Sequence, residues 1–203
     1  IKTLAKKRSE IAKLDMLIAA KSNAWTTSSS LSSIASGSNP LRITFERYIL
    51  SSLLDEVLYA GTLRLKIMSH GRFELFRSTV IEDKRSHGGL NLEVFDSYTG
   101  TKRPVTTLSG GESFLAALSL ALGLADIVQS YAGGIRLETI FIDEGFGSLD
   151  SEALDLALKT LSDLGQGGRL VGIISHVTEL RERIETRLEV ITGKSGSSTQ
   201  FII

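Results

Sequence analysis

The sequence predicts a mixed α/β domain in which a mostly parallel sheet is flanked by helices. Two observations favour this class. In the second half of the chain, apolar runs of strand length alternate with helical patterns, which is typical of parallel sheets covered on their faces. The 203 residues are 42% hydrophobic and 23% charged, which is enough apolar material for a core. A helix and a β-hairpin region are expected to precede this sheet.

The first forty residues are expected to lie outside the main lobe, which we place at 41–203. Residues 1–21 show an apolar stripe of helical period and many lysines, which predicts a helix. This helix is either a solvated amphipathic helix or the stub of a coiled coil, although Lys7 and Lys21 fall at seam positions of the coil. Residues 22–40 are rich in Ser, Thr and Gly, which predicts a loop or linker.

A helix and two strands are predicted next. Residues 45–69 carry apolar side chains at three- and four-residue steps, which predicts a helix with Gly61 as a candidate interruption. Residues 72–80 and 90–95 have the character of strands, and Gly88-Gly89 is a turn signal between them. These segments form the β-hairpin region.

The remaining elements alternate between helix and strand. Residues 113–131 are apolar on most faces and rich in Ala and Leu, which predicts a buried helix. The elements expected after it are a buried strand at 139–142, an amphipathic helix at 151–164, a buried strand at 170–174, a helix at 179–184 and a third strand at 188–191.

Composition excludes several classes of protein. Lys plus Arg and Asp plus Glu are 23 each, so the average charge predicts no polyanion partner, although a local basic patch stays open. The absence of cysteine excludes a disulfide framework, and the three histidines lack zinc spacing. We expect no membrane span, because no run of about 18 apolar residues is present. The chain starts at Ile1 without a signal-peptide pattern, so we expect a fragment of a longer protein.

The first candidate site is the corner Ser109-Gly110-Gly111, directly before the predicted buried helix. The first N–H groups of a helix lack internal partners, and the helix dipole is positive there. Two glycines let the backbone approach an anion closely, and Ser109 adds a hydroxyl donor. The corner is therefore either a phosphate-binding device or a glycine turn with a serine N-cap.

The second candidate site is a pair of carboxylates, Asp143 and Glu144, at the end of the predicted strand 139–142. The carboxyl ends of strands are where α/β sheets bind ligands. Asp143 would hold Mg²⁺ through water beside nucleotide phosphates, and Glu144 would orient a water for in-line attack on the γ-phosphorus. The alternative is two acids that merely end a strand.

Two further positions belong with this edge of the sheet. Asp150 follows the turn that begins at Gly147, and is either a helix N-cap or a residue at a contact between subunits near the nucleotide. His176 ends the strand that should lie beside 139–142, so we expect it at the same carboxyl edge. A purely structural histidine is the alternative.

Together these motifs resemble a known superfamily. Four segments are similar to motifs of ATP-binding-cassette (ABC) ATPases. Leu108–Glu112 resembles their signature motif, and Ile140–Glu144 resembles their Walker B strand. Ser148–Asp150 resembles their D-loop, and His176 resembles their switch histidine. Transporter ATPases usually have Pro-Thr or Pro-Leu where Gly145-Phe146 stands. The glycine form, together with Ile174–Val177, resembles the C-terminal lobe of the SbcC family, the ATPase subunits of SbcCD DNA nucleases, over residues 41–203.

The resemblance implies an ATP hydrolase that uses Mg²⁺, within the C-terminal half of an ABC-type ATPase head. Catalysis is then expected from Glu144 and His176, and Mg²⁺ binding from Asp143. The signature residues expected to contact ATP held by an opposite head are Leu108, Ser109, Gly110, Gly111 and Glu112. The D-loop residues expected at the dimer interface are Ser148, Leu149 and Asp150.

The family keeps its Walker A loop in an N-terminal lobe, and this sequence has no such motif. Gly193-Lys194-Ser195 is a decoy, because Leu188 stands where the first glycine belongs and too little chain follows for a helix. The chain alone is therefore not expected to hydrolyse ATP.

The implied function is that of a DNA-repair ATPase that gates a nuclease. The implied partners are an N-terminal lobe with Walker A, a second identical head, an SbcD-like nuclease and double-stranded DNA, in the cytoplasm at the nucleoid and without a membrane. Candidate contacts to DNA phosphates are Lys2, Lys6, Lys7 and Arg8. Two alternatives stay open: the head of an SMC-like chromosome-organising protein, and the ATPase component of a membrane transporter.

Overall fold

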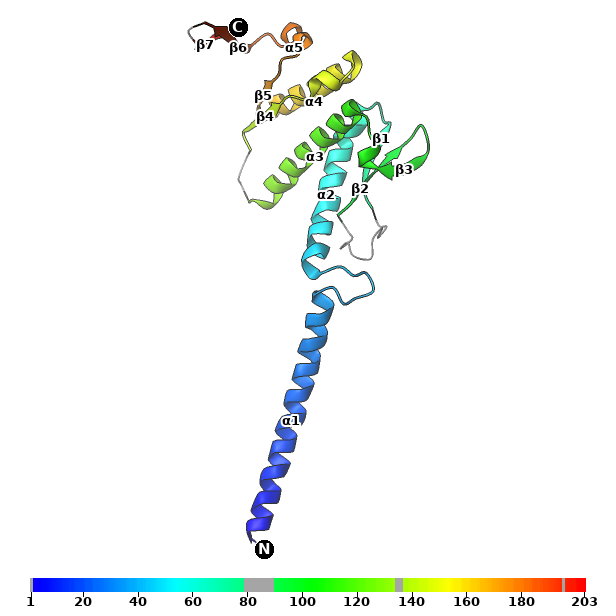
Figure 1. Cartoon of the computed structure of the whole chain (residues 1–203), viewed down its shortest axis with the longest axis vertical. Helices are drawn as coiled ribbons and strands as arrows, with labels where there is room; N and C mark the ends of the chain where they lie inside the picture. The colour runs from blue at the N-terminus through cyan, green and yellow to red at the C-terminus, as the bar shows by residue number, and fades with distance from the viewer. Residues whose placement is uncertain (1, 79–89, 134–136, 195) are drawn as a thin grey trace. The chain divides into compact units, whose positions relative to one another are not determined.

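The computed structural model describes residues 2–78, 90–133, 137–194 and 196–203 (Figure 1). The chain divides into two compact units, one made of residues 1–55 with 77–91 and the other of 56–76 with 92–203. The contacts of the candidate site lie in the second unit. The turn expected at Gly88-Gly89 lies outside the described residues.

Helix α1 (Lys2–Ala35) is longer than the sequence predicts, so the loop expected to begin at residue 22 begins only after Ala35. Thr26 and Thr27 donate their hydroxyls to the carbonyls of Ser22 and Asn23, at 2.9 and 3.1 Å. These polar side chains bond within the helix instead of drawing the backbone into a turn. The serine- and threonine-rich composition therefore does not end the helix.

A Schellman motif with Gly37 as its left-handed residue closes the end of helix α1. Gly37 has a φ of 100°, a left-handed conformation that favours glycine. The N–H of Ser38 donates to the carbonyl of Ser33 at 3.0 Å, and that of Gly37 donates to Ile34 at 3.2 Å. The apolar stripe of the helix is exposed, at Leu4, Ile11, Leu14 and Ile18. Both interpretations of this helix, solvated or coiled-coil, therefore remain open.

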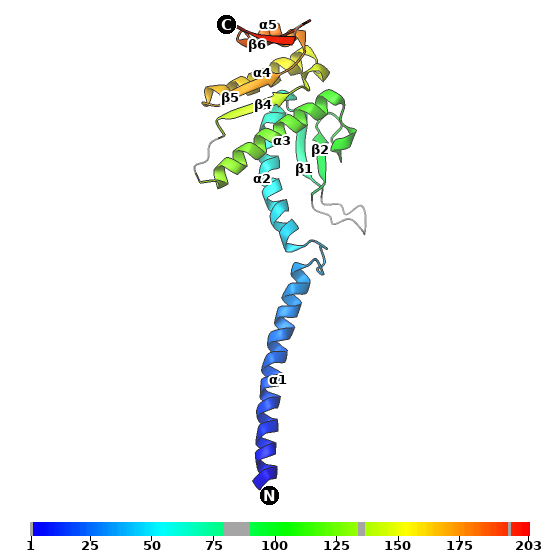
Figure 2. The same ribbon diagram turned by 60° about the vertical axis from the view of Figure 1, so that its left-hand side comes forward.

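Helix α2 (Phe45–Met68) begins at Thr44, whose hydroxyl accepts the N–H of Arg47 at 3.3 Å. Gly61 does not interrupt it. A Cβ on Gly61 would lie 3.0 Å from the carbonyl oxygen of Ser119, and one on Gly123 would lie 2.7 Å from that of Val57. The two glycines thus let α2 cross α3 at close range, as Figures 1 and 2 show.

A three-stranded sheet packs beside the end of α2. Its order is β1 (Phe73–Arg77), β2 (Leu92–Asp96) and β3 (Thr101–Pro104), and β2 and β3 are antiparallel. The buried apolar residues of this region are Leu65, Met68, Phe73, Leu75 and Val94. The short 3-10 helix η1 (Val105–Thr107) then leads from the sheet to Ser109.

Helix α3 (Gly110–Tyr131) is half buried, whereas the sequence predicts a buried helix. Leu118 and Leu122 are buried, but Leu124 and Val128 are exposed. In the part of the chain that the structure describes, α3 is long and apolar enough to cross a membrane by length and composition alone. Polar residues such as Glu112, Ser119 and Asp126 interrupt this helix, so it is not the unbroken apolar run of about 18 residues that our expectation concerned, and the absence of a membrane span stays a prediction. Core helices of soluble proteins meet the same criterion, and the close crossing with α2 is packing of that kind.

The parallel sheet consists of β4 (Thr139–Asp143) and β5 (Leu170–Ile174), paired in register from Thr139↔Leu170 to Asp143↔Ile174. Helix α4 (Ser151–Gln166) lies along it (Figure 2). The prediction that both strands are buried is wrong, because α4 covers one face and Phe141, Leu170 and Ile174 remain exposed. The α/β class is confirmed. The face of the β4–β5 sheet that α4 does not cover carries exposed apolar side chains.

The end of the chain forms a hairpin. After the short helix α5 (Thr178–Arg183), β6 (Arg187–Gly193) pairs with β7 (Gly196–Ile202) in antiparallel fashion. The strand predicted at 188–191 thus exists but pairs with a strand that the sequence analysis did not predict. Gly193 and Lys194 lie at the hairpin turn rather than before a helix. This position agrees with their interpretation as a decoy.

Candidate nucleotide half-site

Parallel pairing brings the catalytic candidates to one edge of the β4–β5 sheet. Asp143, the last residue of β4, is paired with Ile174, the last residue of β5. Glu144 follows directly after β4, and His176 is the second residue after β5. The prediction that both strands end at a shared carboxyl edge is confirmed. The roles of the three side chains in chemistry stay predictions.

Glu144 and His176 contact each other directly. The Nδ1 of His176 lies 2.9 Å from Oε2 of Glu144, and both side chains are open to solvent, at 84% and 47% exposure. The backbone of Glu144 has a φ of 60°, and its N–H donates to the carbonyl of Ile174 at 2.9 Å. A residue other than glycine in this conformation is uncommon and is held by its surroundings. The hydrogen bond to β5 and the contact with His176 provide that support.

Asp143 suits a cation that brings most of its own ligands. Its side chain is exposed, and within the described residues it has no hydrogen-bond or ion-pair partner. The same residues contain no group of three or more His, Cys, Asp or Glu that could enclose a metal. Mg²⁺ typically keeps several waters and binds one or two carboxylates together with substrate phosphates. Asp143 therefore fits Mg²⁺ that arrives with a nucleotide.

The signature corner is a capped helix start. Ser109 is the N-cap of α3 and forms a capping box with Glu112. The Ser109 N–H donates to Oε2 of Glu112 at 2.9 Å, and the Ser109 hydroxyl accepts the Glu112 N–H at 3.4 Å. As a cap, the hydroxyl oxygen acts only as acceptor, so its proton remains available to an anion. The two interpretations of this corner, cap and phosphate contact, are therefore compatible.

The two glycines of the corner have different roles. A Cβ on Gly111 would lie 2.6 Å from the carbonyl oxygen of Ser148, whereas one on Gly110 would lie 3.7 Å from the Cβ of Ser148. Gly111 is therefore required by packing against the D-loop of the same chain. The sequence analysis assigned both glycines to anion approach, and for Gly111 the structure adds this internal constraint.

The D-loop segment begins at Ser148, the last residue of the short 3-10 helix η2 (Phe146–Ser148), and ends at Asp150, directly before α4. The hydroxyl of Ser148 donates to the carbonyl of Gly145 at 2.9 Å. Asp150 is the N-cap of α4, because its carboxylate accepts the N–H of Ala153 at 2.8 Å. The N-cap interpretation of Asp150 is thus confirmed, and a contact at a dimer interface stays a prediction.

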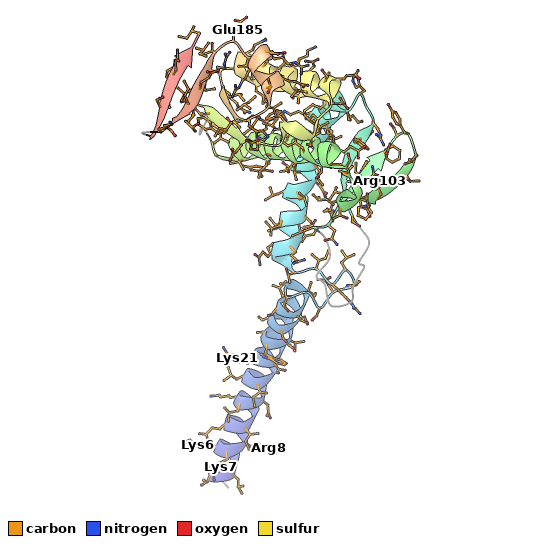
Figure 3. The ribbon with its side chains drawn as sticks, turned by 45° about the horizontal axis from the view of Figure 1, so that its top comes forward. Lys6, Lys7, Arg8, Lys21, Arg103 and Glu185 are labelled. Carbon is orange, nitrogen blue, oxygen red and sulfur yellow. The ribbon has the colours of Figure 1, made fainter. Side chains whose placement is uncertain are left out.

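An ion-pair network that the sequence did not predict holds Glu112. Arg72 binds the buried carboxylate of Asp96 through Nε–Oδ1 at 3.1 Å and Nη2–Oδ2 at 2.9 Å. The Nη1 of Arg72 also lies 3.1 Å from Oε1 of Glu112. Arg103 (labelled in Figure 3) lies 3.6 Å from Asp96 and 3.8 Å from Glu112. The three-stranded sheet is thereby tied to the signature corner.

Within this network the pKa values of Asp96 and Arg72 are shifted. The hydrogen bonds from Arg72 lower the pKa of the Asp96 carboxyl, and Asp96 in turn raises the pKa of Arg72.

One signal in the sequence could have predicted this ion-pair network. Asp96 lies two residues after Val94 on β2, so both side chains face the same side, and both are buried. A carboxylate at an apolar position of a strand predicts a cationic partner.

The network also borders a cleft beside the signature corner. This cleft has a volume of about 360 Å³, and its walls include Ser109, Arg72, Tyr98 and Asp150. The guanidinium of Arg72 lies 4.9 Å from the ring centre of Tyr98, within the range of a cation–π contact. Residues of the β-hairpin region therefore share a surface with the signature motif and the D-loop.

Asp96→Asn is expected to destabilise the assembled head by about 2 kcal/mol at neutral pH, because Arg72 loses a buried anionic partner. Because the pKa of Asp96 is lowered in the folded state, the stabilisation that its carboxylate contributes is fully present above the unfolded-state pKa of about 4. It is lost as the pH falls through the lower folded-state value. Urea denaturation at a series of pH values measures the difference between variant and parent, which should shrink below that range.

Asp55→Asn is the matched control. Asp55 also binds an arginine through two hydrogen bonds, from Arg77 at 2.8 and 2.9 Å, but its side chain is 49% exposed. Such an exposed pair contributes about 0–1 kcal/mol. An equal cost for both variants would contradict the importance of the buried position of Asp96.

The basic residues of α1 do not share one face. Lys6, Lys7 and Arg8 are exposed (Figure 3), and the side chain of Lys2 lies outside the described residues. On an α-helix, Lys6 and Arg8 differ by about 200° around the axis. Only some of them could contact one DNA backbone at a time, and the assignment stays a prediction.

Comparison with known proteins finds one matching family model and several similar proteins. A family model described as "SbcC/RAD50-like, Walker B motif" matches residues 79–163. The SbcC protein of the SbcCD nuclease from Vibrio cholerae serotype O1 is 56% identical over 172 residues, which cover 85% of this chain and 17% of that protein. Its namesake from Staphylococcus aureus strain JH9 is 49% identical over 173 residues, with coverage of 84% and 17%. The chain thus spans 17% of the length of these curated relatives.

Solved structures of SMC heads share the fold. A structure from work on ATP-driven dimerization and DNA-stimulated activation of SMC ATPases has a TM-score of 0.55 at 16% identity, covering 77% of this chain and 89% of that chain. The SMC head domain from Thermotoga maritima has a TM-score of 0.51 at 16% identity, covering 78% and 51%. At such identity the likeness shows the fold alone. The chain is thus a relative of the SbcC proteins of SbcCD nucleases, and its fold is that of the C-terminal lobe of an ABC-type ATPase head.

Proposed function

We propose that this chain is the C-terminal lobe of a DNA-repair ATPase that binds and hydrolyses ATP between two heads and thereby gates a partner nuclease. The observation that carries the proposal is the shared carboxyl edge, where Glu144 and His176 are in contact and Asp143 is open to solvent. Such an edge is where α/β sheets bind nucleotides.

In this proposal Glu144 is the general base. Its carboxylate takes a proton from the water that attacks the γ-phosphorus. The Nδ1–H of His176 donates to Glu144, which holds the carboxylate in place and leaves the lone pair of Nε2 to accept a hydrogen bond from the attacking water. Asp143 would hold Mg²⁺, which when bound neutralises charge on the phosphates.

Ser109 acts on a different nucleotide, one held by the opposite head. The chain contains the signature corner but no Walker A loop, so its α3 N-terminus needs a phosphate held elsewhere. The hydroxyl proton of Ser109 and the positive end of α3 favour a triphosphate over a diphosphate. ATP binding would therefore close the two heads, and hydrolysis would release them.

An N-terminal lobe would complete the sheet. Phe141, Leu170 and Ile174 are 69%, 65% and 54% exposed on the face of β4–β5 that α4 does not cover. A two-stranded sheet is marginally stable by itself. These exposed side chains support a proposal in which further strands and helices of the complete protein cover this face and supply the Walker A loop.

Partners of the whole protein follow from its relatives. The curated relatives are named as the SbcC component of the nuclease SbcCD, which supports a nuclease as partner of this protein and DNA as its substrate. The fold shared with SMC heads favours one alternative, a chromosome-organising clamp. Co-elution of a nuclease with the complete protein would separate the two. Gly145-Phe146 in the Walker B segment counts against a transporter.

Co-expression with the Walker A lobe tests the proposal. We expect neither lobe alone to turn over ATP, and the reconstituted head to do so with Mg²⁺, because the phosphate-binding loop and the base lie on different lobes. A phosphate-release assay measures the rate. Turnover by this chain alone, or an inactive head that is folded and binds ATP, would refute the division of roles.

A further inference from the structure

Gly145 is constrained twice, by its backbone and by an aromatic ring. Its φ is 99°, a conformation that favours glycine. A Cβ at this position would lie 2.2 Å from Cε2 and 2.3 Å from Cδ2 of Phe114, so the ring occupies the place of a side chain. The glycine that distinguishes this Walker B segment from that of transporters is therefore matched to Phe114 on the signature helix.

Phe114 contacts the next residue as well. Its ring lies 4.9 Å from that of Phe146 at an interplanar angle of 64°, an edge-to-face arrangement, and Phe146 is 1% exposed. One turn earlier on α3, Gly111 packs against the carbonyl of Ser148. The first turns of α3 therefore rest at two points on the segment that directly follows Glu144.

This contact lies between two parts that act on different nucleotides. Ser109, at the start of α3, would contact the triphosphate of the opposite head. Glu144, next to Gly145, would act on the nucleotide of its own head. Because Glu144 already has a left-handed φ of 60°, a small change at Gly145 would move its carboxylate relative to His176. A displacement of about 1 Å at such a group can reduce a rate about 100-fold.

We propose that Phe114 is a positioning residue that couples the two half-sites within one head. When Ser109 engages the opposite nucleotide, α3 and the Phe114 ring fix Gly145, and Gly145 fixes the carboxylate of Glu144. The inference rests on the proposed function. It adds that the link between the two nucleotides of a closed dimer runs through the contact of Phe114 with Gly145 inside each head.

The test uses the complete protein with its partner nuclease and the variant Phe114→Ala. We expect kcat to fall about 10- to 100-fold, with KM for ATP and ATP-dependent dimerisation nearly unchanged, since only the position of Glu144 is altered. The Hill coefficient for ATP should fall to about 1. Leu122→Ala is the control, because Leu122 is a buried residue of the same helix that makes no part of this contact. It should lower thermal stability and leave the Hill coefficient unchanged.

Gly145→Ala provides a second, independent variant. It should lower kcat in the same way, and the double variant should be no worse than Gly145→Ala alone, because both changes act on one contact. Phe114→Ala with parental kcat and Hill coefficient, or effects that multiply in the double variant, would overturn the coupling. If the parental protein itself fails to hydrolyse ATP, the proposed function fails instead, and the two failures are distinguishable.

Discussion

Glu144→Gln in the complete protein is expected to reduce ATP turnover about 10²- to 10⁴-fold, the usual contribution of a general base. The amide is nearly isosteric with the carboxylate and can still accept a hydrogen bond from Nδ1 of His176, which lies 2.9 Å from Oε2. It cannot take a proton from water. ATP should therefore bind normally, and closed dimers should accumulate because the step that opens them is blocked.

Two measurements check this result, the phosphate-release rate and the fraction of dimer on size exclusion with ATP. Glu185→Gln is the control, because Glu185 is an exposed carboxylate between α5 and β6 (Figure 3) that the proposal gives no role. It should behave as the parent does. Normal turnover by Glu144→Gln would exclude Glu144 as the base.

Ser109→Arg is expected to abolish ATP-dependent dimerisation while the affinity of a single head for ATP changes by about twofold or less. Ser109 is exposed at the start of α3, so arginine would occupy the space of the opposite triphosphate. In the proposed arrangement, the nucleotide of the same head would lie against other residues. Equal loss of ATP affinity and of dimerisation would argue against contact between Ser109 and the nucleotide of the opposite head.

Ser109→Asp separates phosphate contact from capping. Aspartate is as good an N-cap as serine, so α3 keeps its start. Its negative charge, however, would oppose the γ-phosphate. If Ser109 mattered only as the cap seen in the structure, this variant would dimerise like the parent. We expect it to fail as Ser109→Arg does.

The shared carboxyl edge of β4 and β5 could be predicted because its signal is local. The change from apolar to polar residues marks where each strand ends, and parallel pairing then places Asp143 and Ile174 side by side. The cap at Asp150 is equally local, since an N-cap bonds within its own first turn.

What the sequence did not predict depends on contacts between distant segments. Arg72 and Glu112 lie forty residues apart in the sequence, so only the fold brings them together and no periodicity links them. The requirement for glycine at 111 and 145 comes from Ser148 and Phe114, which only the fold places there. The extension of α1 was missed for another reason, because the Ser- and Thr-rich composition fits both a loop and a helix with internal hydroxyl bonds.

Mixing two inactive variants of the complete protein tests the shared pocket most directly. In a mixed dimer of Ser109→Arg and Glu144→Gln, one composite site combines the intact Glu144 of the first variant with the intact Ser109 of the second. If Ser109 contacts the nucleotide of the opposite head, the ATP turnover rate of the mixture should exceed the sum of the rates of the two separate variants. If mixed dimers form, as shown by differently tagged heads, and turnover stays at that sum, the two residues serve the same nucleotide from one head and the account is contradicted.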